Sequence, residues 1–200
     1  AERPAFYLSL YAVDWSREMG AGHVALVRWR PPEATAATPT DRDGFDQILT
    51  DNPDLARRLR DQLREVGYSR VELSGEPRPA TFIRSRLADP NHIRYVISAV
   101  GLEVDARWDD FGEPEFAYGP APQQPDRQEI WSMLFEAQSG SATVNGHPVP
   151  GAAYPMEHWT PWLGRPLSSA HIARSEILVD LPDLEPDPPP VDGGPAEDLE

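Results

Sequence analysis

The order of hydrophobic and polar positions predicts several strands. Residues 6–13 and 23–29 are rich in aromatic and β-branched residues and are bounded by turn-prone sequence, which is typical of strands. Strands are also predicted at residues 69–74, 80–86 and 102–108. The first and last of these three alternate apolar with charged residues, so each would have one buried and one solvated face.

Three other segments have the spacing of helices with one apolar side. The first covers residues 53–66 and follows Asn52, whose side chain can cap a helix. The second covers residues 90–100 and follows Asp89, another capping residue. The third covers residues 127–138 and begins with the spacing of a capping box.

Turn and loop signals separate these elements. Residues 31–43 and 109–125 are rich in proline and acidic or small polar residues, and both are predicted to be loops. Asn145-Gly146 is a strong signal for a two-residue hairpin. Residues 150–167 are irregular and aromatic, and residues 168–180 fit either a short helix or a strand.

The order of elements indicates an α+β fold. We predict a two-layer sandwich, with a mixed or antiparallel sheet and about three helices packed on one face. Strands with one charged face fit this architecture better than a doubly wound fold, in which parallel strands are buried on both faces. The 200-residue length fits a single domain, which we place at residues 1–180.

Residues 181–200 form a tail of different composition. It contains six prolines, seven acidic residues and no basic residue. Such a segment cannot bury enough apolar surface to offset the entropy of ordering it. We predict that this tail is disordered.

Charge and composition narrow the functional classes. The net charge is −15, all 18 basic residues are arginine, and there is no cysteine. A surface this acidic repels nucleic-acid phosphates and favours a basic protein partner. No apolar run is long enough to span a membrane, so no membrane association is expected. The lack of cysteine fits the cytoplasm best.

The most unusual segment is the loop at residues 154–165. It places Trp159 and Trp162 in irregular backbone beside His158 and Arg165. Two indoles presented in this way could stack on a sugar, a base or a proline of a partner. The alternative is that both fold back as a cover for the hydrophobic core, which is the commoner use of large aromatic residues.

A group of arginines is the second candidate site. Arg84 and Arg86 alternate onto one face of the strand at residues 80–86, and Arg78 and Arg94 lie near them in the sequence. With the start of a helix, such residues can hold a phosphate or a carboxylate. The alternative is ion pairing with Glu72, Glu103 and Asp105 of neighbouring strands, on the same solvated face.

Motifs that would identify an enzyme are missing from the sequence. It contains no P-loop, no dinucleotide-binding glycine pattern, no zinc-protease motif and no nucleophile elbow. The acidic residues between positions 105 and 115 match no calcium-loop spacing. We therefore assign no catalytic residue, no metal ligand and no cofactor, and leave open whether the protein is an enzyme.

Two functional hypotheses remain. The first is a binding or regulatory protein, such as an inhibitor, an immunity-type protein or an assembly subunit, that contacts a protein partner through its acidic surface. The second is an enzyme or small-ligand binder whose site lies around residues 154–165. A bound small molecule would favour the second hypothesis, and a stoichiometric protein partner the first.

Overall fold

A computed structural model describes residues 5–16, 19–31, 44–65, 67–86, 91–120 and 128–179. In this part of the chain the fold is mostly β, with three sheets and two α-helices. The predicted disordered tail and most of the predicted loop at residues 31–43 lie outside the described residues. No helix in the described part is long and apolar enough to cross a membrane.

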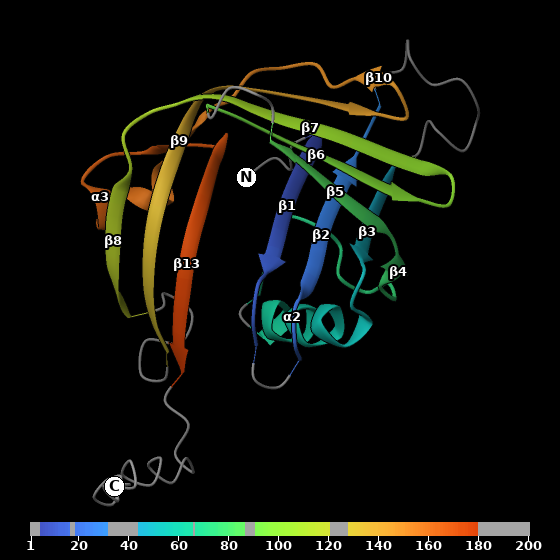
Figure 1. Ribbon diagram of the computed structural model, residues 1–200, viewed down its shortest axis with the longest axis horizontal. Coiled ribbons are helices and arrows are strands. Elements are labelled where there is room, and N and C mark those ends of the chain that lie inside the picture. Colours follow the sequence, from blue (N-terminus) through green and yellow to red (C-terminus); the bar gives the residue numbers. More distant parts are fainter. Residues whose placement is uncertain are drawn as a thin grey trace, which may run out of the picture.

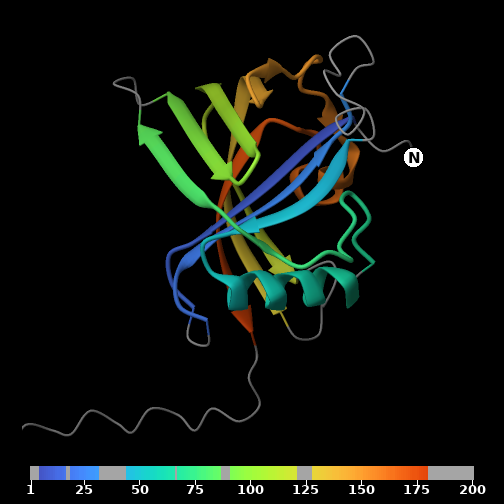
Figure 2. The same cartoon turned by 90° about the vertical axis from the view of Figure 1, so that its right-hand side faces the viewer.

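The first sheet has four strands with a helix beneath it (Figures 1 and 2). Its strands pair in sequence order, antiparallel except for the last pair, which is parallel. The strands are β1 (Phe6–Val13), β2 (Gly22–Trp29), β3 (Phe45–Thr50) and β4 (Arg78–Pro79). Helix α2 (Pro53–Glu65) packs on one face through Leu55 and Ala56.

The second sheet crosses the other face of the first (Figure 1). Its main path runs β10-β9-β7-β6-β5 and is antiparallel throughout. The strands are β5 (Thr81–Arg86), β6 (His92–Ala99), β7 (Leu102–Phe111), β9 (Gln128–Val144) and β10 (His147–Pro148). The described molecule is thus layered as helix, sheet and sheet.

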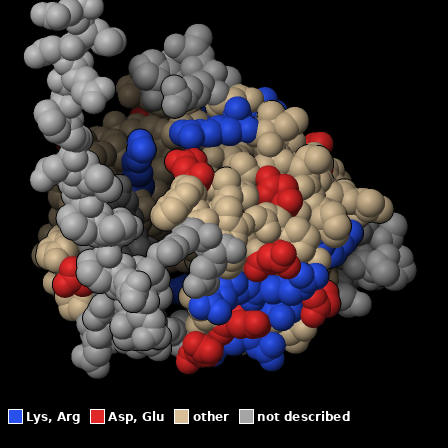
Figure 3. Space-filling view, turned by 60° about the horizontal axis from the view of Figure 1, so that its bottom comes forward, with Lys and Arg blue, Asp and Glu red and all other residues tan. Residues whose placement is uncertain are grey.

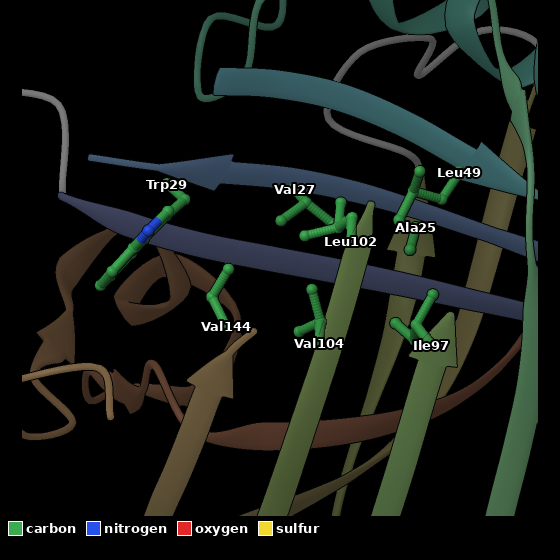
Figure 4. Packing of buried hydrophobic residues seen from close by; sticks show 8 residues of the cluster. All are labelled: Ala25, Val27, Trp29, Leu49, Ile97, Leu102, Val104 and Val144. Atoms are coloured by element: carbon green, nitrogen blue, oxygen red, sulfur yellow. The ribbon is translucent and has the colours of Figure 1, made fainter. Parts of the chain in front are cut away.

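Strand β2 is the centre of this arrangement because both of its faces are buried. Val24 and Leu26 point toward α2, whereas Ala25, Val27 and Trp29 point toward the second sheet. Figure 4 shows the second set meeting residues of the facing strands, among them Ile97, Val104 and Val144. Complete burial of so many apolar side chains makes this the main hydrophobic core.

Strand β9 is 17 residues long and belongs to two sets of pairings. Its second half pairs with β7, from Ala137 to Val144. Its first half lies between β8 (Glu115–Pro120) and β13 (His171–Val179), both antiparallel to it. Figure 1 shows these three strands side by side, apart from the first sheet. One continuous strand therefore connects the core of the sandwich to a three-stranded wing, β8-β9-β13, of the same seven-stranded sheet.

A small aromatic layer covers one face of this wing. It contains a two-stranded sheet and two short helical turns packed against Ala117, Leu134 and Leu167. The elements are β11 (Pro155–Met156), the 3₁₀ turn Glu157–Trp159, α3 (Thr160–Leu163) and β12 (Leu167–Ser168). The predicted irregular segment is thus partly regular, and the ambiguous segment after it is a strand.

The predicted α+β sandwich with about three helices is wrong. Residues 90–100, predicted as a helix, contain β6, in which Tyr95 and Ile97 are buried and Val100 is 90% exposed. The third predicted helix, at residues 127–138, falls on the first part of β9, which begins at Gln128. Residues 69–74 are not a strand, although Val71 and Leu73 are buried beside α2.

The two helix predictions were wrong because the apolar residues of each segment fit both helical and strand periodicity. Apolar residues at 93, 96, 97 and 100 have helical spacing, but positions 93, 95, 97 and 99 also alternate inward as in a strand. The abundance of β-branched residues and the availability of β5 and β7 for pairing favour the strand. Local spacing alone cannot decide between these alternatives.

Several local predictions are confirmed. Helix α2 begins after Asn52, whose Oδ1 accepts a hydrogen bond from the Leu55 N–H (3.2 Å), and is followed by Gly67 at φ +69°. Strands β1, β2, β5 and β7 form where strands were predicted. The Asn145-Gly146 turn joins β9 and β10, with both residues at positive φ, as a tight hairpin requires.

A buried ion pair lies within the first sheet. Arg28 Nε and Nη2 donate to the two carboxylate oxygens of Asp46, at 3.1 and 2.9 Å, and both side chains are almost fully buried. Asp46 also accepts the backbone N–H of Glu72 (2.8 Å), and Arg28 Nη1 donates to the carbonyl of Arg70 (3.1 Å). The pair thereby ties the non-helical segment after α2 to the sheet.

Asp46→Asn should destabilise the protein by about 3–5 kcal/mol, because it leaves the Arg28 guanidinium buried without a counter-charge. Urea melts followed by circular dichroism measure the loss. Asp61→Asn, in an exposed carboxylate of α2, is the control and should change stability by less than about 0.5 kcal/mol. Equal effects of the two substitutions would contradict a structural role for the buried pair.

Candidate functional site

The loop at residues 154–165 lies against the wing as core cover. Trp159 and Trp162 contact each other edge to face, with ring centroids 6.2 Å apart, and both pack against the Ala117–Leu134–Leu167 cluster. Trp159 also meets the ring of His171 at 5.8 Å. Both indoles are partly buried. The arrangement agrees with the packing interpretation of this loop, and the side chain of His158 lies outside what is described.

Arg165 fastens this loop to the wing. Its Nη2 donates to Glu136 Oε2 at 2.7 Å and to a carboxylate oxygen of Glu115. Glu136 Oε1 also accepts the backbone N–H of Ser168 (3.1 Å). The hydrogen bond to Glu136 raises the pKa of the guanidinium, burial opposes this shift, and the hydrogen bond to Glu115 adds to it. The structure therefore brings Trp159, Trp162 and Arg165 together, with the arginine already paired.

The predicted arginine group is divided between two faces of the second sheet. Arg94 is on the outer face and forms two hydrogen bonds with Asp105, at 2.8 and 2.6 Å. Arg84 is on the opposite, inner face, paired in register with Tyr95. Arg78 instead donates to Gln47 and to the carbonyl of Val100. The predicted ion pairing on the Glu103–Asp105 face therefore holds for Arg94 but not for Arg84.

Arg86 ends β5, and its side chain lies outside what is described. The outer face nearby has a second polar cluster, in which Asp109 accepts hydrogen bonds from His92 Nδ1 and from Arg107 Nε (2.5 Å). These acidic side chains are occupied by arginine or histidine. Within the described ranges, no three His, Asp or Glu side chains are grouped so as to hold a metal ion.

The α2 surface is a mixture of both charges, as Figure 3 shows. Arg57 Nη1 donates to Asp54 (2.9 Å), and Arg60 donates to Asp61 and Glu76 (3.0 and 3.1 Å). Exposed ion pairs of this kind contribute little stability, and Figure 3 shows the basic residues of this face bordered by acidic ones. This arrangement gives no support to nucleic-acid binding by the helix.

Sequence reasoning missed a group at one end of the core, which we call the His23 cluster: His23, Asp51, Phe82, Arg84, Tyr95 and Trp108. His23 Nδ1 pairs with Asp51 Oδ2 at 2.8 Å, and Asp51 Oδ1 accepts the His23 backbone N–H at 2.6 Å. The imidazole stacks on Phe82 with ring centroids 5.0 Å apart and planes 13° from parallel. The sequence gives no local signal for it, because its members come from five strands or their ends.

Tyr95 connects the members of the His23 cluster. Its ring meets the edge of His23 at 6.3 Å and of Trp108 at 6.5 Å, and Arg84 Cζ lies 5.9 Å from its centroid. Tyr95 is only 7% exposed, whereas Arg84 is exposed. Burial raises the pKa of the Tyr95 hydroxyl, with Arg84 opposing and Asp14 reinforcing the shift. The phenol therefore remains a protonated donor at neutral pH.

A second group was hidden in the predicted loop at residues 109–125. Strand β8 alternates there, with Ala117 buried on the side of the aromatic cover and its two neighbours on the other side. Phe116 and Tyr118 are 60% and 65% exposed, and they oppose Met133 and Trp131 of β9. We call Phe116 and Tyr118, together with half-buried Trp131 and Met133 beside them, the exposed aromatic face. The alternating sequence of residues 115–119 was the available signal.

Trp159→Ala and Trp162→Ala should each lower the free energy of unfolding by about 3 kcal/mol, because each removes a large ring from the cover of the wing. Chemical denaturation provides the measurement. Trp15→Ala is the matched control, since that indole is 76% exposed, and it should have little effect. Unchanged stability of the Trp159 variant would instead favour a recognition role for that ring.

The Arg94–Asp105 pair predicts an acid-dependent stability difference. The hydrogen bond from Arg94 lowers the pKa of Asp105, so its stabilisation is present above the ordinary aspartate pKa and is lost as the pH falls through the lowered value. Wild type should exceed Asp105→Asn in stability at pH 6, and the difference should shrink below about pH 4. Arg94→Met should show the same dependence. Thermal melts from pH 7 to pH 2 test this, and a constant difference would contradict it.

Comparison with known proteins adds no family to these observations. No protein-family model matches the chain, no curated protein matches it significantly, and no solved structure does so.

Proposed function

We propose that this is a binding or regulatory protein of the cytoplasm that contacts a basic protein partner through its exposed aromatic face. The observation that carries the proposal is the exposure of Phe116 and Tyr118 on one side of β8. Large aromatic side chains grouped on a surface are typical of protein-binding sites, in which they supply contact area at a small entropic cost.

The geometry of the wing supports a permanent rather than a transient exposure. The opposite side of β8 is buried by the Trp159–Trp162 layer, which fixes the strand in place. Phe116 and Trp131 lie 6.0 Å apart in a tilted arrangement, and the Tyr118 hydroxyl donates to Glu129 at 2.6 Å. The surface is therefore held rigid before any partner arrives, which reduces the cost of binding.

Charge favours a basic partner over a second copy of this chain. Each molecule carries a net charge of −15, so two copies repel one another. Glu129 adds a carboxylate beside Tyr118, and an arginine of a partner could pair with it while stacking on the rings.

The edge of the wing offers a second means of contact. Among the described strands, β8 pairs only with β9, so its other edge has backbone groups available for an added strand. A strand added there would lie alongside Phe116 and Tyr118. Backbone pairing would supply affinity, and the rings would supply selectivity.

A small-ligand function centred on residues 154–165 has less support. Trp159 and Trp162 are committed to the cover of the wing, and Arg165 is neutralised by two carboxylates. No catalytic group has been identified in this loop. An enzyme whose reacting groups lie elsewhere in the chain is compatible with these observations.

Phe116→Ser should weaken the complex with the natural partner by at least about tenfold while leaving the unfolding free energy nearly unchanged. Partners would be cross-linked in the native cell, identified, purified and titrated by calorimetry. Ile83→Ser is the control, because Ile83 is also exposed but lies on the second sheet. Its affinity should match wild type.

Added salt should weaken the complex, since opposite charges attract across the interface. Binding that is insensitive to Phe116→Ser, or a purified partner as acidic as this chain, would contradict the proposal.

A further inference from the structure

We infer that the His23 cluster is a binding site for a small aromatic carboxylate, a planar ring bearing one negative charge. This site is separate from the exposed aromatic face and would serve a small molecule rather than a protein. It combines a cation, a polarised imidazole, a protonated phenol and aromatic rings at one end of the core.

Arg84 is the anion-binding group. Its strand register puts it on the inner face of the second sheet, where its guanidinium lies against the Tyr95 ring. In the described part of the chain no carboxylate forms an ion pair with it, although acidic residues outnumber basic ones by 33 to 18. By contrast, Arg94 and Arg107 each form an ion pair with an aspartate of β7. Arg84 differs from these two arginines because its guanidinium lies over an aromatic ring.

His23 adds an oriented polar group. Asp51 Oδ2 lies 2.8 Å from Nδ1, so Nε2 is the ring nitrogen that faces away from this carboxylate. The stacked Phe82 ring fixes the plane of the imidazole, so the orientation exists before a ligand binds. A hydroxyl can donate a hydrogen bond to a ring nitrogen or accept one from it, so Nε2 suits a ligand that also carries a hydroxyl, such as a hydroxybenzoate.

The aromatic members supply an apolar surface beside the arginine. Phe82 packs against the main core, where Ile97 is fully buried, and Tyr95 of β6 lies between exposed Arg84 of β5 and Trp108 of β7. The cluster thus spans the boundary between the dry core and solvent. Aromatic surfaces with a few oriented polar groups are typical of small-ligand sites.

A nearby acid restricts the ligand to one negative charge. Asp51 belongs to the cluster through its hydrogen bonds to His23. A dianion such as a phosphate monoester would meet this carboxylate with only one arginine to balance its two charges. A monocarboxylate satisfies Arg84 with two oxygens in a bidentate contact and adds no further charge.

The test is a titration of the ¹⁵N-labelled full chain with benzoate, and separately with benzamide, its neutral counterpart of similar shape. Benzoate should shift amide signals of β2, β5, β6 and β7 near the His23 cluster, saturating in the millimolar range, about 1–10 mM. Benzamide should bind at least about tenfold more weakly, because it lacks the charge that Arg84 recognises.

Arg84→Gln should weaken benzoate binding by about tenfold or more, and His23→Gln should reduce the preference for 4-hydroxybenzoate over benzoate. Arg174→Gln is the control, an exposed arginine on the wing, and should bind benzoate as wild type does.

Unperturbed amide spectra of the variants establish that they fold. Equal affinity for benzamide, no effect of Arg84→Gln, or no saturable shift with benzoate would overturn the inference. Loss of binding in Phe116→Ser alone would likewise move the site to the wing.

Discussion

The double burial of β2 is the constraint on which the rest of the structure depends. When both faces of a strand are covered, side chains on both faces need apolar neighbours. In β2, Leu26 packs on the side of α2 and Val27 packs on the side of the second sheet. The exception is Arg28, whose charge is retained in the interior only because Asp46 lies on the adjacent strand. Removal of either layer would expose one half of the same strand, so neither layer is an independent unit.

Strand β9 fixes the position of the wing, because it belongs both to the second sheet and to the wing. Val144 lies in the main core, and Leu134 of the same strand lies beneath the aromatic cover. The wing therefore needs no hydrophobic core shared with the first sheet, since its position follows from backbone pairing along one long strand. This allows one face of β8 to stay exposed while the other is fixed.

The sequence predicted the elements whose local signals agree with one another. Helix α2 has a capping residue, an apolar stripe and a terminating glycine. The Asn145-Gly146 pair is typical of a two-residue hairpin turn. The sequence-based prediction was wrong at β6 and β9. Apolar residues such as Ile97 and Leu134 there fit both helical and strand periodicity, and pairing with distant strands determines which structure forms. Arg165 was recognised as part of a notable loop, but its pairing with Glu115 joins residues 50 positions apart. The His23 cluster is likewise a product of sheet topology, since His23 and Arg84 are related only through the packing of two sheets.

The dependence of the wing on β13 has a consequence for biosynthesis. Strand β9 can pair with β7 and β8 as soon as it leaves the ribosome, but β13 and the residues that cover Leu134 are made later. Until then the growing chain presents an apolar surface and an open strand edge, which are the features that chaperones bind and that promote aggregation. Residues 155–179 are therefore the last part of the wing to be made, and they close its edge and cover its apolar face.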